Sequence, residues 1–568
     1  MALLRLSASL NNGGLMYKLL ILLGLLFMAS CSKDDQNVNV DNDNIENPDD
    51  QNKGDGDKDK DDDNSDDNSD DKDKDDDNSD DENKDYEGEY GDLTFANDYE
   101  EAMYMTVKFF GGQRCGDANN WMLEENDDIS VDPVCHIKDE FNGNDLTGGW
   151  HDCGDHIKVA HTMGYSAVCL LTAYDVWPTA FKDYYSQNYG KADGIPDVLN
   201  EVKVATDYFM KSFPDENTFV YYVGNGSHDH DRWINSAEQS TLKNSDGGEA
   251  EGPREVMFTT DAGGSTAGNY STALSLMSIL YREHDAKYAD KCLESAIKIY
   301  KFAKKNCEEV VSIPTFYPRV NKDWWDELAL AATMLYRITD EDEYRLDSRG
   351  FYADKYQSNY PESWDTVADI AYYYMVKYRS DQSYTEDLLA RNVGKGIKSA
   401  TSYGLPWKWS GLSKWGVNKL FCGSAFAAAL YAQALKEETI RGELPDLEGD
   451  DVTEEDSWAY NKKIVDYMLG DNEFGHPFIH GFKGDMTHKI HHRNSMGRTL
   501  KDDDGYTTTE QKNTLDYRFA SGGLIGGPVK EGVFSNIVEG GTAYKETEGG
   551  CDYNAPFIGA LANLLANQ

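Results

Sequence analysis

Apolar residues at helical spacing recur along this chain from about residue 93 to its end, and this pattern constrains the fold more than any other feature. Ala273, Leu276 and Met277, for example, follow the i, i+3 and i+4 spacing of one buried helix face. We expect helices over Tyr99–Phe110, Lys158–Val176, Ile195–Phe213, Ser271–Glu283, Ala286–Lys305, Trp325–Tyr336, Asp342–Tyr356, Trp364–Val376, Thr385–Ala400, Gly423–Leu435, Glu454–Met468 and Ala555–Ala566. About a dozen helices joined by long irregular loops predict one large all-α domain, residues 93–568, in which an outer helical ring closes around an inner one.

The amino terminus has a different composition and predicts a processed segment. A charged start at Met16 precedes the apolar run Leu19–Met28, and small residues precede Cys31. This pattern resembles a bacterial lipoprotein signal over residues 1–31, and it implies cleavage before Cys31 and lipid on the thiol of that cysteine. Residues 1–14 lack signal character, so Met16 is the expected initiator. The alternative, a transmembrane anchor, requires a longer apolar run.

Residues 32–92 are expected to form an acidic, disordered tether. The segment Ser32–Asp35 resembles the acidic signal that directs lipoproteins of Bacteroidetes-type bacteria to the outer face of the outer membrane. Between Cys31 and Tyr90 the chain has 27 acidic residues and seven lysines, with almost no apolar residues to offset the entropy of ordering. We expect a solvated spacer that holds the protein at the cell surface. Loose calcium binding by its aspartates is the alternative interpretation.

The charge of the chain restricts its ligands. The sequence has 103 acidic residues against 54 lysines and arginines, and the part beyond the tether is also strongly acidic. This balance argues against nucleic acid or anionic lipid as a ligand, and it suits a neutral or cationic one. We therefore expect no nucleic-acid partner.

Two acidic motifs stand beside glycines just before apolar helices. In Gly148–His156 the carboxylates Asp152 and Asp155 lie three positions apart, where they could hold a water, a sugar hydroxyl or a metal, or simply cap a helix. Near the carboxyl end, Tyr544–Phe557 has the same character: the acid Glu548, then glycines, aromatics and an apolar helix.

These motifs resemble glycoside hydrolase family 9. The segment around Glu548 is similar to the signature in which Tyr-x-x-x-Glu precedes Asp-Tyr-Asn-Ala, Gly148–Asp155 resembles the other catalytic stretch, and Ile490–Arg493 resembles the His-x-Arg signature. Gln113–Gly116 and further internal segments extend the likeness from about Phe95 to Ala566. The resemblance implies a six-hairpin (α/α)6 barrel with the active site on its loops, and hydrolysis of β-1,4-glucosidic bonds with inversion.

The resemblance also implies catalytic roles. Asp155 would be the general base, Asp152 would help to hold the water, and Glu548 would be the general acid. An inverting pair leaves room for a water, with carboxyl groups on the order of 6.5 to 9.5 Å apart. Because Glu548 must stay protonated near neutral pH, we expect a desolvated site in which Asp552 or Glu546 raises its pKa.

Further residues would bind the sugar. His491, counted with the catalytic residues, and Arg493 would form hydrogen bonds with sugar hydroxyls; the alternative is a pair of surface basic residues. Aromatic rings stack on the C–H faces of glucose, although burial between helices is an equal alternative for any one tryptophan. The expected substrate-binding residues are Arg493, Trp415, His230, Trp233, Tyr553 and Trp364.

A cysteine and histidine set predicts a structural zinc site. Cys115, Cys135, His136 and His151 supply two thiolates and two imidazoles, which make a full tetrahedral zinc set. Members of one branch of the family have such a site, and these residues match it. The alternative is a disulfide between Cys115 and Cys135. If zinc binds, His151 would position the two aspartates of the catalytic turn.

A calcium site is also implied by the resemblance. Asp326, Glu327 and Asp365 match carboxylates that bind calcium in many members, and oxygen ligands suit that hard cation. Lys322 and Asp323 depart from the family pattern, and the alternative is that Lys322 replaces the ion with a salt bridge.

We therefore expect a monomeric inverting endo-β-1,4-glucanase, a cellulase acting on cellulose or related β-glucans. Departures at Glu539, Gly549–Gly550 and Lys419 leave the substrate open to xyloglucan, mixed-linkage glucan or a glucosamine oligomer. A glycan-binding surface lipoprotein is the non-enzyme alternative, but binding alone does not need the three carboxyl groups of Asp152, Asp155 and Glu548.

Overall fold

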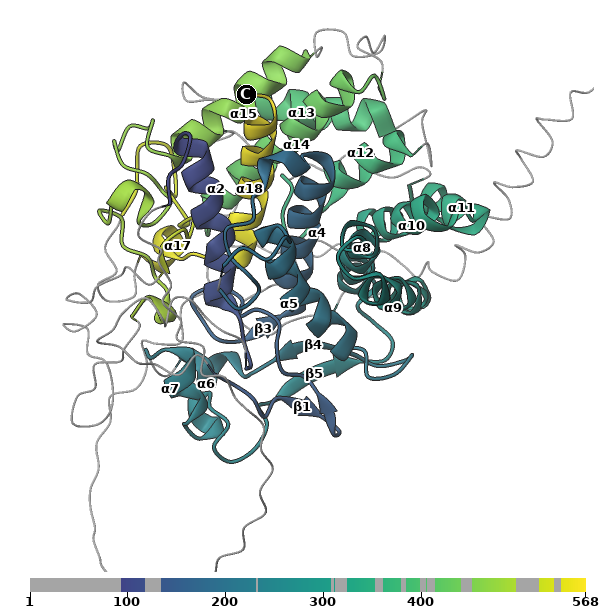
Figure 1. Ribbon diagram of the computed structural model, residues 1–568, viewed down its shortest axis with the longest axis vertical. Coiled ribbons are helices and arrows are strands. Elements are labelled where there is room, and N and C mark those ends of the chain that lie inside the picture. The colour runs from purple at the N-terminus through teal and green to yellow at the C-terminus, as the bar shows by residue number, and fades with distance from the viewer. Residues whose placement is uncertain are drawn as a thin grey trace, which may run out of the picture. The chain divides into compact units, whose positions relative to one another are not determined.

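Six of the described helices form a closed inner ring (Figure 1). They are α4 (Ala160–Val176), α8 (Gly264–Leu280), α10 (Trp325–Thr339), α12 (Ala368–Lys377), α14 (Val417–Lys436) and α18 (Cys551–Ala566). Each packs against the next in this order, and α18 packs against α4 to close the ring. These helices are covered on nearly all sides: every residue of α8 from Gly264 to Ser278 is buried, its Ser, Thr and Asn residues included.

The structure is a computed structural model. It describes residues 93–117, 134–189, 191–230, 233–307, 311, 324–352, 361–378, 385–398, 405, 414–440, 452–496, 520–535 and 543–568. The described residues all lie within one unit, Glu89–Gln568. The expected signal peptide, the lipidated Cys31, the initiator Met16 and the tether lie outside the described residues.

The outer ring alternates with the inner one along the chain. It consists of α2 (Asp98–Lys108), α5 (Asp197–Lys211), α9 (Ala286–Lys305), α11 (Asp342–Tyr352), α13 (Thr385–Lys398) and α15 (Glu454–Met468). Each packs against one or two inner helices. The outer helices bury a single stripe: in α9, Tyr288, Cys292, Ala296 and Ile299 face inward at helical spacing. The expected six-hairpin (α/α)6 barrel is confirmed.

Several helices begin or end at other residues than expected. Helix α8 begins seven residues earlier than expected, after Gly263, and α14 begins after Gly416; both glycines are left-handed, with φ of 90° and 67°. Helix α18 begins at Cys551 rather than Ala555, which brings its first turn next to Glu548. The part of the expected helix Asp342–Tyr356 beyond Tyr352 lies outside the described residues.

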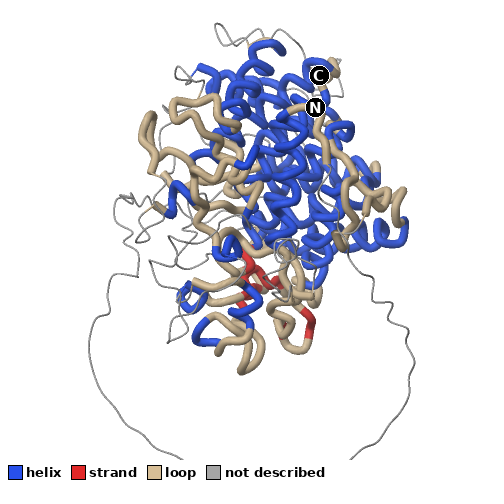
Figure 2. Tube along the Cα trace, turned by 60° about the vertical axis from the view of Figure 1, so that its left-hand side comes forward, coloured by secondary structure: helices blue, strands red, loops and turns tan. Residues whose placement is uncertain are grey.

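The sequence did not indicate the short strands and short helices, and the strands lie together at one end of the helical body (Figure 2). Strands β3 (Lys158–Val159), β4 (Phe219–Val223) and β5 (Val256–Thr259) form an antiparallel sheet in that order, and β1 (Glu140–Phe141) pairs with β2 (Asn144–Asp145). The short helices are α6 (Gly226–His230), α7 (Ser236–Ser240), α17 (Tyr544–Thr547), η2 (Phe109–Gln113), η3 (Pro178–Ala180), η4 (Asn244–Asp246), η5 (Phe482–Gly484) and η6 (Arg493–Met496). None of the described helices combines the length and the apolar character needed to cross a membrane.

Candidate active site

The predicted catalytic acids lie at the start of two neighbouring inner helices. Asp152 and Asp155 come just before α4, and Glu548 comes just before α18. The barrel joins the two motifs through their backbones: Cys551 N donates to Asp152 O at 3.1 Å. The expected His-x-Arg segment joins them on both sides, since His491 N donates to Thr547 O at 2.8 Å and Arg493 N donates to Gly154 O at 3.1 Å. Segments far apart in the sequence thus form one site.

Glycine is required at the closest of these approaches. A Cβ atom on residue 154 would lie 2.5 Å from the carbonyl oxygen of His491, closer than a real contact allows. Gly416 combines its positive φ with a similar approach, since a Cβ there would lie 2.6 Å from the Tyr553 ring. The glycines of the motifs therefore let the backbone pack against the other catalytic segments.

The two aspartates have different hydrogen bonds. Asp152 accepts a bond from the Thr162 hydroxyl on Oδ1 and one from the Cys153 thiol on Oδ2, at 3.1 Å. Asp155 is 6% exposed, and its Oδ1 has no hydrogen-bond partner among the described residues. Burial, then the charges of Asp152 and Asp229, raise the pKa of Asp155 well above its usual range. The carboxyl group of Asp155 therefore has an increased affinity for a proton, and its Oδ1 is left without a donor by the described residues.

Glu548 has the raised pKa expected of a general acid. Burial raises the pKa of Glu548 to about 7, and Asp152 and Asp552 raise it as well. The indole Nε1 of Trp415 donates to Glu548 Oε2 at 2.7 Å and lowers this pKa, and the Tyr553 hydroxyl lies 3.5 Å from the same oxygen. Of the two acids expected to cause the shift, Asp552 contributes, and burial is the main cause.

A lysine offsets the charge of Asp552 beside the general acid. Lys419 Nζ lies 2.7 Å from Asp552 Oδ2 and 4.5 Å from the centre of the Tyr553 ring. It lowers the pKa of Glu548. The departure from the family pattern at residue 419 therefore lies in direct contact with the acid side of the site.

Three predicted sugar-binding residues lie in one aromatic row. The ring centres of Trp233 and His491 are 4.5 Å apart, those of His491 and Tyr544 are 6.2 Å apart, and those of Tyr544 and Trp415 are 4.9 Å apart. The role of Tyr544 was not predicted. Its signal was present, because it is the first residue of the Tyr-x-x-x-Glu motif, one turn of α17 before Glu548.

Arg493 has a partner within the protein that the sequence did not indicate. The guanidinium of Arg493 is buried, and its Nη1 lies 2.6 Å from both the backbone oxygen and Oδ2 of Asp229. Burial raises the pKa of Asp229, but Arg493 and His230 more than offset this and keep it low. The predicted His230 places Nδ1 3.4 Å from Asp229 Oδ2. Asp229, which directly precedes His230 in the sequence, anchors this side of the site.

Two predicted sugar-binding residues, Trp364 and Tyr553, are not part of the aromatic row. Half-buried Trp364 makes an edge-to-face contact with His161 of α4, on the opposite side of the inner ring, with ring centres 5.9 Å apart. Burial lowers the pKa of His161 to about 4, so this imidazole is neutral at pH 7. Tyr553 is buried between Lys419 and Glu548.

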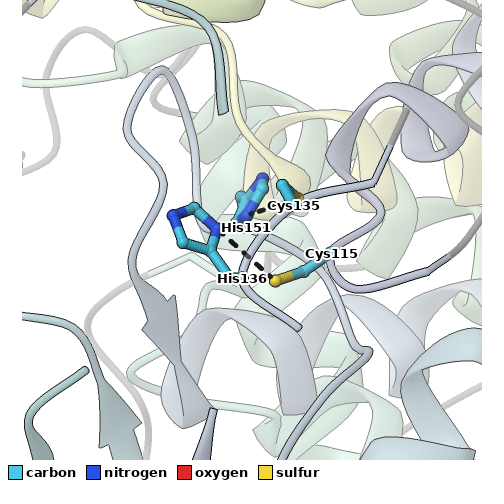
Figure 3. Close-up of side chains that lie close together, drawn as sticks. All are labelled: Cys115, Cys135, His136 and His151. Carbon is cyan, nitrogen blue, oxygen red and sulfur yellow. Dashed lines mark hydrogen bonds between the residues drawn. The ribbon is translucent and has the colours of Figure 1, made fainter. Parts of the chain in front are cut away.

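The predicted zinc ligands converge (Figure 3). Cys115 Sγ lies 3.9 Å from His136 Nδ1, and Cys135 Sγ lies 3.9 Å from His151 Nε2. One ligand atom from each of the four buried side chains lies within 4.8 Å of all the others. His136 adopts the left-handed conformation, with φ of 49°, which costs about 1–2 kcal/mol in a residue other than glycine. This backbone places the side chains of two consecutive residues at one centre, a set suited to a metal ion.

The expected alternative, a disulfide, is not formed. Both Cys115 and Cys135 are free thiols, as is every other cysteine among the described residues. Burial raises the pKa of Cys115, but its contact with Cys135 and the charge of Lys158 outweigh burial and hold that pKa well below its usual range. A thiolate is the form that binds a metal.

A buried ion network joins this cluster to the catalytic turn. Asp139 Oδ2 lies 2.7 Å from Arg254 Nη2 and 2.8 Å from Lys158 Nζ. Arg254 also donates to the carbonyl oxygen of His156 at 2.7 Å and lies 4.0 Å from Cys115 Sγ. No local pattern in the sequence indicates this network, because its members come from different loops and strands.

The predicted calcium ligands are less completely assembled. Asp326 Oδ2 accepts hydrogen bonds from Thr366 Oγ1 at 2.8 Å and from Val367 N at 2.7 Å. Burial, then Asp326, raises the pKa of Glu327 well above its usual range, and Asp365 contributes. Within the described ranges this trio is not among the groups whose ligand atoms all lie within 4.8 Å of one another. Lys322 and Asp323 lie outside the described residues.

Comparisons with known proteins agree with this site. The sequence model of glycosyl hydrolase family 9 matches residues 99–561. Endoglucanase A of Bacillus pumilus is 27% identical over 497 residues, which cover 82% of this chain and 66% of that protein. A cellulase of C. cellulolyticum solved with cellobiose is 28% identical, with a TM-score of 0.65 over 83% of this chain and 98% of that one. The endoglucanase of the termite Nasutitermes takasagoensis is 25% identical, with a TM-score of 0.65 over 83% of this chain and all of that one.

Proposed function

The chain belongs to glycosyl hydrolase family 9, and we propose that it is an inverting endo-β-1,4-glucanase acting on cellulose or related β-glucans. The observation that carries this proposal is the pairing of two carboxyl groups with different environments. Asp155 has a buried oxygen without a partner among the described residues, and Glu548 has a pKa of about 7. One group can accept a proton while the other donates one.

In the proposed reaction Asp155 and Glu548 act on opposite sides of the scissile bond. Asp155 Oδ1 takes a proton from the attacking water, whose oxygen bonds to the anomeric carbon as the bond to the leaving oxygen breaks. Glu548 gives its proton to that leaving oxygen. Thr162 and Cys153 fix the carboxylate of Asp152, which then orients the water, and Trp415 fixes Glu548. Each group thus meets the reacting atoms in one orientation.

The aromatic row supports a β-glucan as the substrate. Trp233, His491, Tyr544 and Trp415 offer ring faces and polar edges beside the acid, as sugar binding requires. A structural relative was solved with cellobiose, and the curated relatives include endoglucanases. Because the chain covers only 66% of the Bacillus protein, its substrate range is part of this proposal.

A panel of polysaccharide substrates, tested with the wild type and with a variant that lacks the general acid, tests the function. We expect the protein to release reducing ends from soluble and amorphous β-1,4-glucans, and Glu548→Gln to abolish this while oligosaccharide binding persists. Activity on xyloglucan, mixed-linkage glucan or glucosamine oligomers alone would change the substrate and keep the mechanism. Binding without hydrolysis of any of these polymers would favour the glycan-capturing lipoprotein instead.

The four-residue cluster fits a structural zinc ion. Two sulfur and two nitrogen atoms gathered in a buried site are the ligand set that zinc prefers, and they would tie the loop at Cys115 and Cys135 to His151 in the catalytic turn. Bound zinc would supply a crosslink and no step of the reaction. Metal analysis of the purified protein should find one zinc that Cys135→Ser removes, and a full equivalent in that variant would disprove this ligand set.

Calcium at Asp326, Glu327 and Asp365 is a second proposed metal. The support is the Oε2 of buried Glu327, which has no hydrogen-bond partner among the described residues, and the repulsion among these carboxyl groups, which a hard cation would relieve. Thermal unfolding should shift upward when calcium is added to chelator-treated protein. An identical shift in Glu327→Gln would contradict the assignment.

We also propose that the protein is an outer-membrane lipoprotein exposed at the cell surface. The support is the signal-like segment before Cys31 and the acidic residues after it. The full chain should enter the detergent phase on phase separation and be cleaved by protease added to intact cells. Unchanged detergent partitioning of Cys31→Ala would contradict lipidation at that residue.

A further inference from the structure

In the proposed reaction Cys153, the thiol between the two aspartates, holds Asp152 in place but bonds to no reacting atom. Cys153 Sγ lies 3.1 Å from Asp152 Oδ2 and 4.0 Å from Asp155 Oδ2. The sulfur and one oxygen from each carboxylate all lie within 4.8 Å of one another, and all three side chains are buried. These atoms form a ligand group separate from the four residues of the proposed zinc site.

A second observation points to a ligand at this group. The second oxygen of the Asp155 carboxylate, Oδ1, has no hydrogen-bond partner among the described residues, although only 6% of the surface of this residue is exposed. A buried carboxylate oxygen without a donor is costly unless a bound species satisfies it. The proposed water can do so, and a cation can replace that water.

The surrounding charges favour a cation. Asp229, Glu548 and Asp552 add carboxyl groups around the turn, and the nearby basic side chains are engaged by acids: Arg493 by Asp229 and Lys419 by Asp552. Carboxyl groups therefore outnumber basic ones around Cys153. Such a site attracts positive charge.

We propose that Asp152, Cys153 and Asp155 bind a thiophilic divalent cation such as Cd²⁺, which inhibits hydrolysis by occupying the oxygens of the general base. The thiol loses its proton to solvent as the metal–sulfur bond forms. A sulfur ligand selects soft or borderline metals, whereas Mg²⁺ and Ca²⁺ prefer oxygen ligands alone. The site is thus an inhibitory metal site, with the sulfur as its selective element.

Cadmium added to the metal-loaded enzyme tests the proposal. Bound cadmium is counted after equilibrium dialysis, and activity on a soluble β-glucan is followed relative to each variant's own rate without cadmium. The wild type should bind one equivalent more than Cys153→Ala. Half-inhibition of the wild type should need at least about tenfold less cadmium than half-inhibition of Cys153→Ala, because loss of even an outer-shell partner lowers the affinity of a metal site by about 10- to 100-fold. Magnesium at the same concentration should not inhibit.

Controls separate this site from the other thiols. Cys422→Ala removes a buried thiol of α14 outside the active site and should keep the sensitivity of the wild type. Cys153→Ser keeps a small polar side chain and should be as resistant as Cys153→Ala. Cellobiose should protect the wild type by competing for the same space. Equal sensitivity of wild type and both Cys153 variants, or no protection by cellobiose, would place the inhibitory ion elsewhere and overturn the proposal.

Discussion

Replacing Trp415 by phenylalanine should make the general acid harder to ionise. The indole Nε1 donates a 2.7 Å hydrogen bond to Glu548 Oε2, and this bond stabilises the ionised carboxylate more than the neutral acid. Phenylalanine keeps a ring next to Tyr544 but has no N–H. The ionised form loses a donor, so the pKa of Glu548 rises above about 7.

The size of the shift follows from the burial of the acid. Glu548 is 8% exposed, so water compensates little for the lost bond. A hydrogen bond to a charged group contributes about 1.5–3 kcal/mol, and about 1.4 kcal/mol corresponds to one pKa unit. The alkaline limb of the pH profile should therefore move upward by about 1–2 units. Activity requires protonated Glu548, present below its pKa, so the variant stays active to higher pH.

The pH dependence of kcat/KM on a soluble β-glucan measures this shift, because it reports the pKa values of the free enzyme. Trp177→Phe is the matched control: its indole N–H donates to Gln433, away from the site, and its loss should leave the limb in place. An alkaline limb that stays at the position of the wild type in Trp415→Phe, or that moves downward, would refute the assignment of this limb to Glu548.

Three further changes probe the packing of the site. Gly154→Ala should lower kcat by about 100-fold, because its Cβ would displace His491 and misplacement by about 1 Å has this cost; near-normal kcat would contradict the close approach. Asp229→Asn leaves Arg493 as a buried charge without its carboxylate and should lower the free energy of unfolding in urea by about 3–5 kcal/mol, whereas a loss under about 1 kcal/mol would mean a solvated pair. With calcium held in excess, Cys135→Ser should lower the melting temperature and make it insensitive to a zinc chelator, and continued sensitivity to that chelator would argue against this metal site.

The barrel could be predicted from the sequence because its helices carry their own signal. Outer helices such as α9 bury one stripe, and inner helices such as α8 combine apolar residues with small ones and carry no charged residue, so both patterns appear in short windows of sequence. The sheet could not be predicted. Strand β3 has two residues, too few to show alternation, and its pairing with β4 depends on the fold.

The same distinction between local patterns and contacts made by the fold applies to the candidate site. Asp152, Asp155 and Glu548 stand in local motifs and could be named from them. Thr162 was missed, because its contact with Asp152 is one of many open to a threonine in an apolar helix. The partner of Arg493 was missed because no local pattern joins it to Asp229; only the folded loops bring them together.

The stereochemistry of the first product tests the proposed mechanism most directly. With Asp155 activating water on the face opposite the bond that Glu548 protonates, the new hydroxyl replaces the leaving oxygen with inversion. Proton NMR of a cello-oligosaccharide digest, recorded before the anomers equilibrate, should show the α-anomer of the new reducing end appearing first. Initial appearance of the β-anomer would contradict the roles given to Asp155 and Glu548.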